Sequence, residues 1–149
     1  MVKFTFPYPP TANLLTSTLV VKGRAIRCKT AAARKYKVAA HKCIEFEREP
    51  YESLIGVRLS AFRPRRVGDI DNIIKACLDA MSFDKDVLDK QGNVKIGERA
   101  HWVWKDDEQV KELHVTMNDD KHNPRVEVEV WELAGKQENL EILEEETLF

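Results

Sequence analysis

The chain lacks the features that mark secreted proteins, membrane-spanning proteins and proteins with a structural zinc site. Its three cysteines (Cys28, Cys43 and Cys77) are widely spaced and odd in number, which argues against a disulfide framework or a zinc site. No apolar run reaches the roughly 18 residues of a membrane span, and the N-terminus has no signal-peptide pattern. These absences predict a cytoplasmic protein without a membrane partner, and 149 residues suffice for one domain with a real core.

Acidic residues are absent from the first 44 positions, which carry nine lysines and arginines. The net charge of -1 hides this polarity, because residues 134–149 have a local charge of -4 and leave residues 1–133 at +3. A basic N-terminal third predicts contacts with phosphate, although a solvated helix face is the alternative for any single lysine-rich stretch. The DNA-contact candidates in this third are Arg24, Arg27, Lys29, Arg34, Lys35 and Lys37.

Two short segments gather the groups needed for phosphodiester hydrolysis. Residues 65–75 read Arg-Arg-Val-Gly-Asp-Ile-Asp-Asn-Ile-Ile-Lys, and residues 106–110 read Asp-Asp-Glu-Gln-Val. Carboxylate oxygens are preferred ligands of Mg²⁺, so acids from two segments can form a metal site. Arginines beside such a site can hold the polyanion that carboxylates alone would repel.

The first segment also predicts local structure. Asp69 and Asp71 share a face only where the chain is extended, so a helix is expected to begin after them with Asp71 as its N-cap. Lys75 then lies one turn above Asp71. The helix is amphipathic, with apolar positions at Ile73, Ile74, Cys77, Leu78 and Met81. The alternative is an ordinary capped helix in which Asp71 satisfies its own backbone and Lys75 is only solvated.

The remaining pattern predicts an α+β fold, with a mixed or antiparallel sheet and two main helices packed on one face. Strands are expected at residues 2–6, 55–61 and 102–104, a hairpin at 19–27 around Lys22-Gly23, and a helix at 30–48. Residues 113–117 are expected to pair with residues 126–130 across a turn at 118–124. The acidic pair Asp119-Asp120 is assigned to that turn.

Together with Pro-Tyr-Pro-Pro-Thr-Ala-Asn at residues 7–13, the two acidic segments resemble the RusA-type Holliday junction resolvases of prophages and bacteria, over roughly residues 4–133. The resemblance implies a Mg²⁺-dependent endonuclease, with one or two ions per site, that resolves four-way junction DNA by paired nicks during recombination or repair. It also implies a homodimer. The implied metal ligands are Asp69, Asp71 and Asp107 with Asp106 adjacent, the implied catalytic lysine is Lys75, and the implied DNA contacts are Arg65, Arg66 and Asn72.

Two departures from the family bear on junction contacts. Residues 82–100 contain an insertion, and Val67-Gly68 replaces a run of arginines found in some members. Two alternative functions stay open at this point. One is a non-catalytic DNA-binding accessory protein of recombination, and the other is a broader structure-selective nuclease that cuts flaps or branches.

The last 16 residues, 134–149, form an acidic segment without periodic apolar positions, for which disorder is expected. Leu148 and Phe149 resemble the apolar anchors of the Gln-Leu-x-Leu-Phe peptides that dock on the bacterial sliding clamp, although Glu145 stands where glutamine is usual. The sliding clamp is therefore a predicted partner of the tail.

Overall fold

The computed structural model describes residues 1–10, 16–29, 31–44, 49–65, 70–83, 87–96 and 101–133. Several predicted site residues lie outside these ranges, namely Asp69, Arg66, Leu148 and Phe149, and so does the acidic tail. The side chains of Arg27 and Lys29 are also outside the described part, although their backbone is included.

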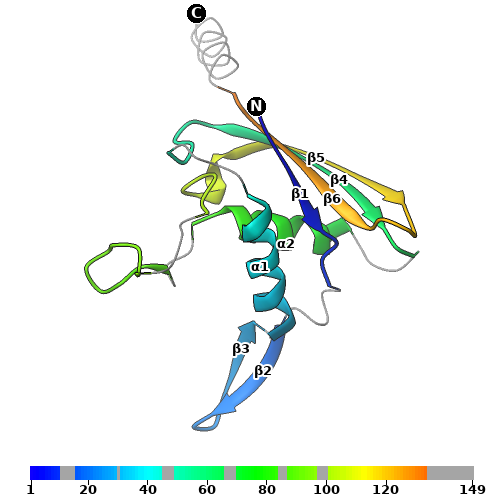
Figure 1. The fold of residues 1–149 in the computed structure, drawn as a ribbon. Coiled ribbons are helices and arrows are strands. Elements are labelled where there is room, and N and C mark those ends of the chain that lie inside the picture. Colours follow the sequence, from blue (N-terminus) through cyan, green and yellow to red (C-terminus); the bar gives the residue numbers. More distant parts are fainter. Residues whose placement is uncertain are drawn as a thin grey trace, which may run out of the picture.

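A four-stranded mixed sheet forms the centre of the fold (Figure 1). Its strands are β1 (Val2–Pro7), β4 (Ile55–Arg63), β5 (Val110–Asp119) and β6 (Arg125–Glu132), in the spatial order β1-β6-β4-β5. β6 is antiparallel to both β1 and β4, whereas β5 is parallel to β4. The predicted α+β class with a mixed sheet is confirmed.

The predicted pairing of residues 113–117 with residues 126–130 is wrong, because β4 lies between β5 and β6. Alternate residues of β4 (Ile55, Val57, Leu59 and Ala61) are all fully buried, as expected for a central strand with a partner on each side. The turn after β5 therefore passes the end of β4, where the Asp120 amide donates to the Arg63 carbonyl at 2.9 Å.

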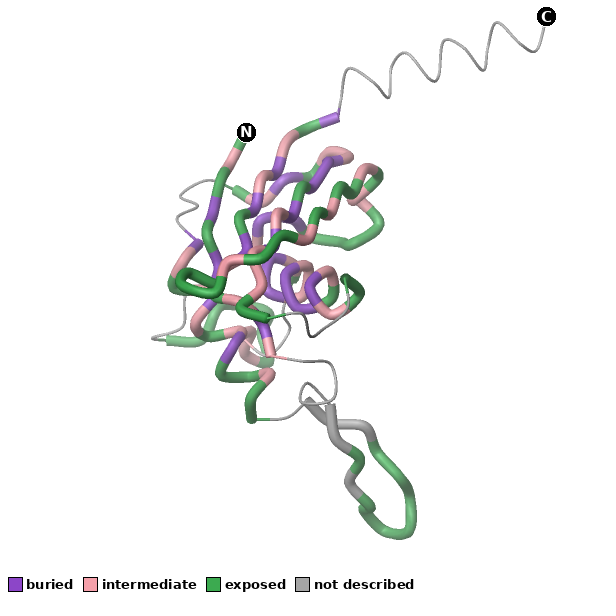
Figure 2. Tube along the Cα trace, turned by 90° about the vertical axis from the view of Figure 1, so that its right-hand side faces the viewer, coloured by how far each residue is buried: buried purple, intermediate pink, exposed green. Residues whose placement is uncertain are grey.

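Two helices, α1 (Ala31–Cys43) and α2 (Ile70–Met81), cover one face of this sheet (Figure 1). Their buried residues pack with the inward side chains of the strands into one core, which Figure 2 shows as a band of buried chain between helices and sheet. The opposite face of the sheet is polar. There Glu129 pairs with Lys3 and with Arg58.

Both helix boundaries differ from the prediction. α1 ends at Cys43, and the buried Ile44 that follows is already outside the helix. Residues 45–48, including Phe46, lie outside the described part. α2 already includes Ile70, so Asp71 lies within the first turn and is not the N-cap. The small difference at α2 is the ordinary uncertainty of a helix terminus. The five-residue difference at α1 exceeds it, because apolar periodicity continues past Cys43 without marking where the helix stops.

A polar contact inside the core joins both helices to the sheet. The Tyr36 hydroxyl of α1 donates to the Pro7 carbonyl at 2.9 Å and lies 4.0 Å from the Cys77 sulfur of α2. Burial raises the pKa of Tyr36 far above its ordinary value and raises the pKa of Cys77 to about 12. Both groups therefore stay neutral and serve packing.

Three smaller pieces complete the fold. β2 (Thr16–Val21) and β3 (Arg24–Lys29) form a separate two-stranded hairpin, as predicted. The predicted strand at 102–104 is only a single bridge between Trp104 and Tyr51. Between α2 and the short helix η3 (Asp107–Gln109), Asp89 accepts hydrogen bonds from the amides of Gln91 and Asn93, which closes a small loop. In the ranges described, no helix has both the length and the apolar content to cross a membrane.

Candidate functional site

The second acidic segment forms the short helix η3 (Asp107–Gln109) just before β5. Asp106 caps it, because its side chain accepts from the Glu108 amide at 3.0 Å. The Gln109 side-chain oxygen accepts in return from the Asp106 amide at 2.9 Å. Asp-x-x-Gln is thus a capping box, a signal that the sequence carries.

Gln109 also fixes η3 to the chain that enters β4. Its amide nitrogen donates to the carbonyls of Tyr51 and Ser53, at 2.7 and 2.9 Å. Beside them Lys105 pairs with Glu52, and the hydrogen bond from this lysine holds the pKa of Glu52 below its ordinary value. The acidic segment is therefore held in one position by side chains outside the predicted set of metal ligands.

Asp107 is held by a buried indole. Trp104 is completely buried, and its ring N–H donates to Asp107 Oδ1 at 2.9 Å, while Asp107 itself is exposed. The indole therefore orients the carboxylate through Oδ1, and Oδ2 has no hydrogen bond to any described residue. Outer partners of this kind commonly position metal-binding carboxylates. The sequence analysis did not identify Trp104 as the residue that positions Asp107.

The first acidic segment lies at the start of α2. Asp71 and Lys75 are both exposed, whereas Asn72, the residue after Asp71, is half-buried. Neither Asp71 nor Lys75 forms a hydrogen bond or ion pair with any other described residue, and the same holds for the exposed Arg65. Within the described ranges, no protein group therefore competes with a ligand for these charges.

Among the described residues, the structure does not bring Asp71 and Asp107 together within one chain. β4 and β5 are parallel, so the start of β5 lies beside Ile55 at the start of β4. α2 follows the far end of β4 and runs back, until the Met81 carbonyl accepts from the Val103 amide at 2.8 Å. Asp71 and Met81 are ten residues apart on α2, or about 15 Å at 1.5 Å per residue, and Asp107 follows four residues after Val103 at the Met81 end.

Acidic residues of one chain therefore do not form a complete metal site in the described ranges. No group of three or more His, Cys, Asp or Glu side chains there is close enough to hold an ion. Asp69, which precedes α2, lies outside those ranges.

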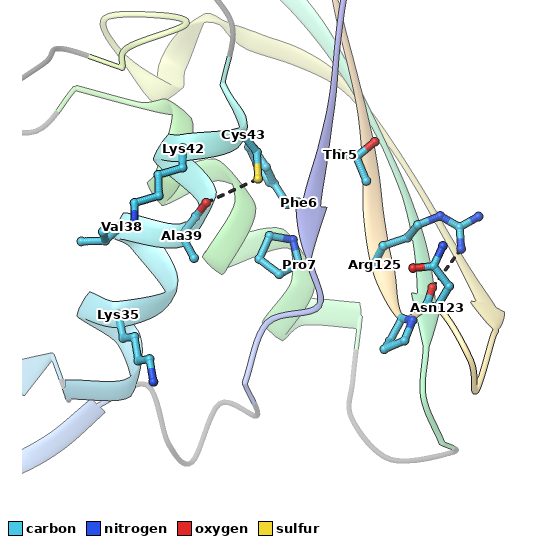
Figure 3. Close-up of a pocket in the computed structure, with 11 residues that line it drawn as sticks. Thr5, Phe6, Pro7, Lys35, Val38, Ala39, Lys42, Cys43, Asn123 and Arg125 are labelled. Atoms are coloured by element: carbon cyan, nitrogen blue, oxygen red, sulfur yellow. Dashed lines mark hydrogen bonds between the residues drawn. The ribbon is translucent and has the colours of Figure 1, made fainter.

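The predicted DNA contacts lie mainly on α1 and the hairpin. Arg24, Arg34 and Lys35 are exposed, whereas Lys37 is half-buried. Lys35 and Lys42 line a groove of about 770 Å³ between α1, the end of β1 and the start of β6 (Figure 3). None of its lining residues is acidic. The groove therefore has a positive character that suits a phosphate backbone.

Other charges near this end of the sheet serve the fold. Arg63 pairs with Asp119, which lies at the end of β5. Asp120 accepts from the amides of His122 and Asn123, at 3.2 and 3.1 Å, and thereby closes the turn. The assignment of Asp120 to turn chemistry is confirmed, while Asp119 has a partner on β4.

A further arginine, Arg125, was not predicted to have a role. Its guanidinium pairs with Asp120 and Glu127 and lies 3.9 Å from the centre of the Phe62 ring. Its charge is thus largely compensated, and Lys35 and Lys42 remain the principal positive groups of the groove.

No model of a known protein family matches the chain, and no curated protein matches it either. The resemblance to the RusA-type resolvases therefore rests on the quoted motifs alone.

Proposed function

We propose that the chain is a Mg²⁺-dependent endonuclease that resolves Holliday junctions and acts as a homodimer. The observation that carries the proposal is the start of α2, where exposed charges of both signs lack partners among the described residues. Elsewhere Arg63 and Arg125 pair with carboxylates. Asp71, which has no ion-pair partner in the described ranges, can instead bind a metal ion. Lys75 and Arg65 can bind a phosphate.

The donor set fits Mg²⁺, which prefers carboxylate oxygens. Asp71 has no competing partner among the described residues, and Asp107 keeps Oδ2 because Trp104 occupies Oδ1. Asp69 would complete the ligand set, with Asp106 adjacent to Asp107. When bound, Mg²⁺ supplies an activated water and stabilises the departing 3′-oxygen.

The other residues would position the DNA. Lys75, one helical turn from Asp71, would compensate the negative charge that builds on the scissile phosphate. Arg65 would hold a neighbouring phosphate. Arg66 and Asn72, which are close to it in sequence, would add further contacts to the DNA. The basic surface of α1 would bind the backbone of a junction arm.

The distance between Asp71 and Asp107 sets a requirement on the assembly. Two ions in such nuclease sites lie only about 4 Å apart, so these two residues of one chain cannot share a site. A two-fold dimer can place Asp71 of one copy against Asp107 of the partner subunit, and does so twice. A four-way junction also has two-fold symmetry and is cut at two matched strands, which matches a dimer with two composite sites.

Labelled four-way junction, incubated with Mg²⁺ or with EDTA, tests the activity. We expect paired symmetric nicks with Mg²⁺ only, and loss of cleavage with intact binding in Asp71→Asn and in Asp107→Asn. Asp119→Asn is the matched control, because that carboxylate pairs with Arg63 and should be dispensable for cutting. Uncut junction under all conditions would overturn the nuclease assignment. Flap and duplex substrates in parallel separate a resolvase from a general branch nuclease.

A mixing experiment tests the composite site. Co-refolding Asp71→Asn with Asp107→Asn gives mixed dimers in which one site carries both substitutions and the other carries neither. Random pairing then restores about a quarter of the wild-type sites, seen as single nicks. If the mixture stays inactive while wild-type protein cuts with Mg²⁺, the composite arrangement fails and the nuclease assignment stands.

A non-catalytic DNA-binding accessory protein is the second candidate. The observation that favours it is the structural role of the second acidic segment, because Asp106 caps η3 and Asp107 receives the Trp104 N–H. Both acids thus have a role without any metal. This candidate predicts a shifted but intact junction in Mg²⁺ and in EDTA alike.

A further inference from the structure

We infer that the β2–β3 hairpin enters the open centre of branched DNA and provides the preference for branched over duplex substrate. The inference rests on the proposed DNA substrate but not on the cleavage chemistry. The hairpin extends from the start of α1, away from the four-stranded sheet (Figures 1 and 2). Each strand has six residues and is about 20 Å long at 3.3 Å per residue, which is long enough to reach into a junction.

Apolar side chains at the tip are left in solvent. Val20 is 75% exposed and Val21 is 48% exposed, next to the two-residue loop Lys22-Gly23. An isolated two-stranded hairpin is only marginally stable in water, so exposed valines on it are unfavourable unless a partner covers them. Because these valines lie at the tip, the partner is expected to contact the end of the hairpin and not its side.

The charges of the hairpin identify nucleic acid as that partner. Its cationic residues are Lys22, Arg24, Arg27 and Lys29, and residues 16–29 contain no carboxylate. The positive charge continues into the first turns of α1, where Arg34 and Lys35 are exposed. A surface that combines cations with exposed apolar groups suits phosphates together with the faces of bases.

The backbone of the loop presents its lysine at the tip. Lys22 and Gly23 both have positive φ, at 51° and 78°. Positive φ at both central residues is typical of the type I′ turn, which favours asparagine or glycine at the position of Lys22. A lysine is costly there, and residues in such conformations concentrate at functional sites.

Branch points explain why valines belong at this tip. In duplex DNA the bases are stacked, so inserting an apolar wedge has to break stacking at each step. At the centre of a junction the stacking is already interrupted, and base faces are accessible at lower cost. Val20 and Val21 therefore gain contact area with branched DNA that duplex DNA does not offer, whereas Lys22 and Arg24 contact phosphates of either substrate.

The test uses the double variant Val20→Thr/Val21→Thr and synthetic DNA in EDTA, so that binding is measured without cleavage. Threonine is β-branched and keeps the strand, but replaces a methyl group by a hydroxyl. We expect the ratio of junction affinity to duplex affinity to fall about tenfold, because less apolar surface is buried. We also expect wild-type protein to increase the fluorescence of 2-aminopurine placed at the crossover, and the double variant to lose this increase.

Two control variants separate the contributions. Val94→Thr replaces another partly exposed valine, in the insertion loop, and should leave the ratio unchanged. Lys22→Gln/Arg24→Gln should weaken junction and duplex binding by similar factors. An unchanged ratio and unchanged fluorescence in Val20→Thr/Val21→Thr would overturn the inference. So would a loss of dimer in size-exclusion chromatography, because the valines would then contact a second copy. Mg²⁺-dependent cutting by wild-type protein reports the proposed function separately.

Discussion

Replacing Asp107 separates its contact with Trp104 from its proposed role as a metal ligand. In Asp107→Ala the buried indole N–H loses its acceptor, and an unpaired buried donor costs about 1–3 kcal/mol of folding free energy. The lower part of that range is expected, because Asp107 is exposed and water can take its place. In Asp107→Asn the amide oxygen can still accept the bond, so the loss should be about 1 kcal/mol or less.

Urea unfolding of both variants, with wild-type protein and Glu108→Gln, measures these differences. Glu108 is an exposed acid on the same turn, and its substitution removes one charge with an effect within about 0.5 kcal/mol. Cleavage should follow a different order. Asp107→Asn and Asp107→Ala should both be inactive, because each removes a proposed metal ligand, whereas Glu108→Gln should cut normally.

The two measurements can contradict the reasoning independently. If Asp107→Asn cuts junctions at the wild-type rate and Asp107→Ala is only less stable, Asp107 serves Trp104 alone and the metal assignment is wrong. If Asp107→Ala unfolds at the wild-type urea concentration, the hydrogen bond contributes nothing measurable and the indole does not position the carboxylate.

Three further predictions concern the α1 surface, the sheet and the turn. Neutralising Arg34, Lys35 and Lys37, three of the four lysines and arginines of α1, should weaken junction and duplex binding alike. The salt dependence should flatten by up to about three phosphate contacts, which titration at several salt concentrations checks. Gly56→Ala should cost about 1–3 kcal/mol, because its Cβ would overlap the Trp131 ring, and a double-mutant cycle with Trp131→Leu should show coupling. Hydrogen bonds from the Asn123 amide and Arg125 lower the pKa of Asp120 below 3.8, so its contribution to stability is present above about pH 4 and lost as pH falls through the lowered pKa. Asp120→Asn should flatten the acid side of a stability–pH profile, and an unchanged profile would contradict that role.

Elements with a strong local pattern could be predicted from the sequence. Ile55, Val57, Leu59 and Ala61 alternate, and all four are buried on β4. The pair Lys22-Gly23 marked the hairpin loop. Strand pairing could not be predicted in the same way. Period-two alternation tells which face of a strand is buried but not which strand lies beside it. The valines of β6 suit β4 as well as they suit β5, so their partner could not be identified.

The candidate site shows the same limit at longer range. The capping box of Asp106 spans only four residues, so the sequence carries its signal, although the sequence analysis used Asp106 only as a neighbour of the metal ligands. Whether Asp107 meets Asp71 depends instead on the direction of β5. An antiparallel β5 would begin beside Arg63, near the start of α2, and one chain could then assemble all the acids. The observed strand is parallel and begins beside Ile55. Strand direction is not encoded in either acidic segment, yet it decides whether a metal site needs one chain or two, and the mixing of Asp71→Asn with Asp107→Asn measures that difference.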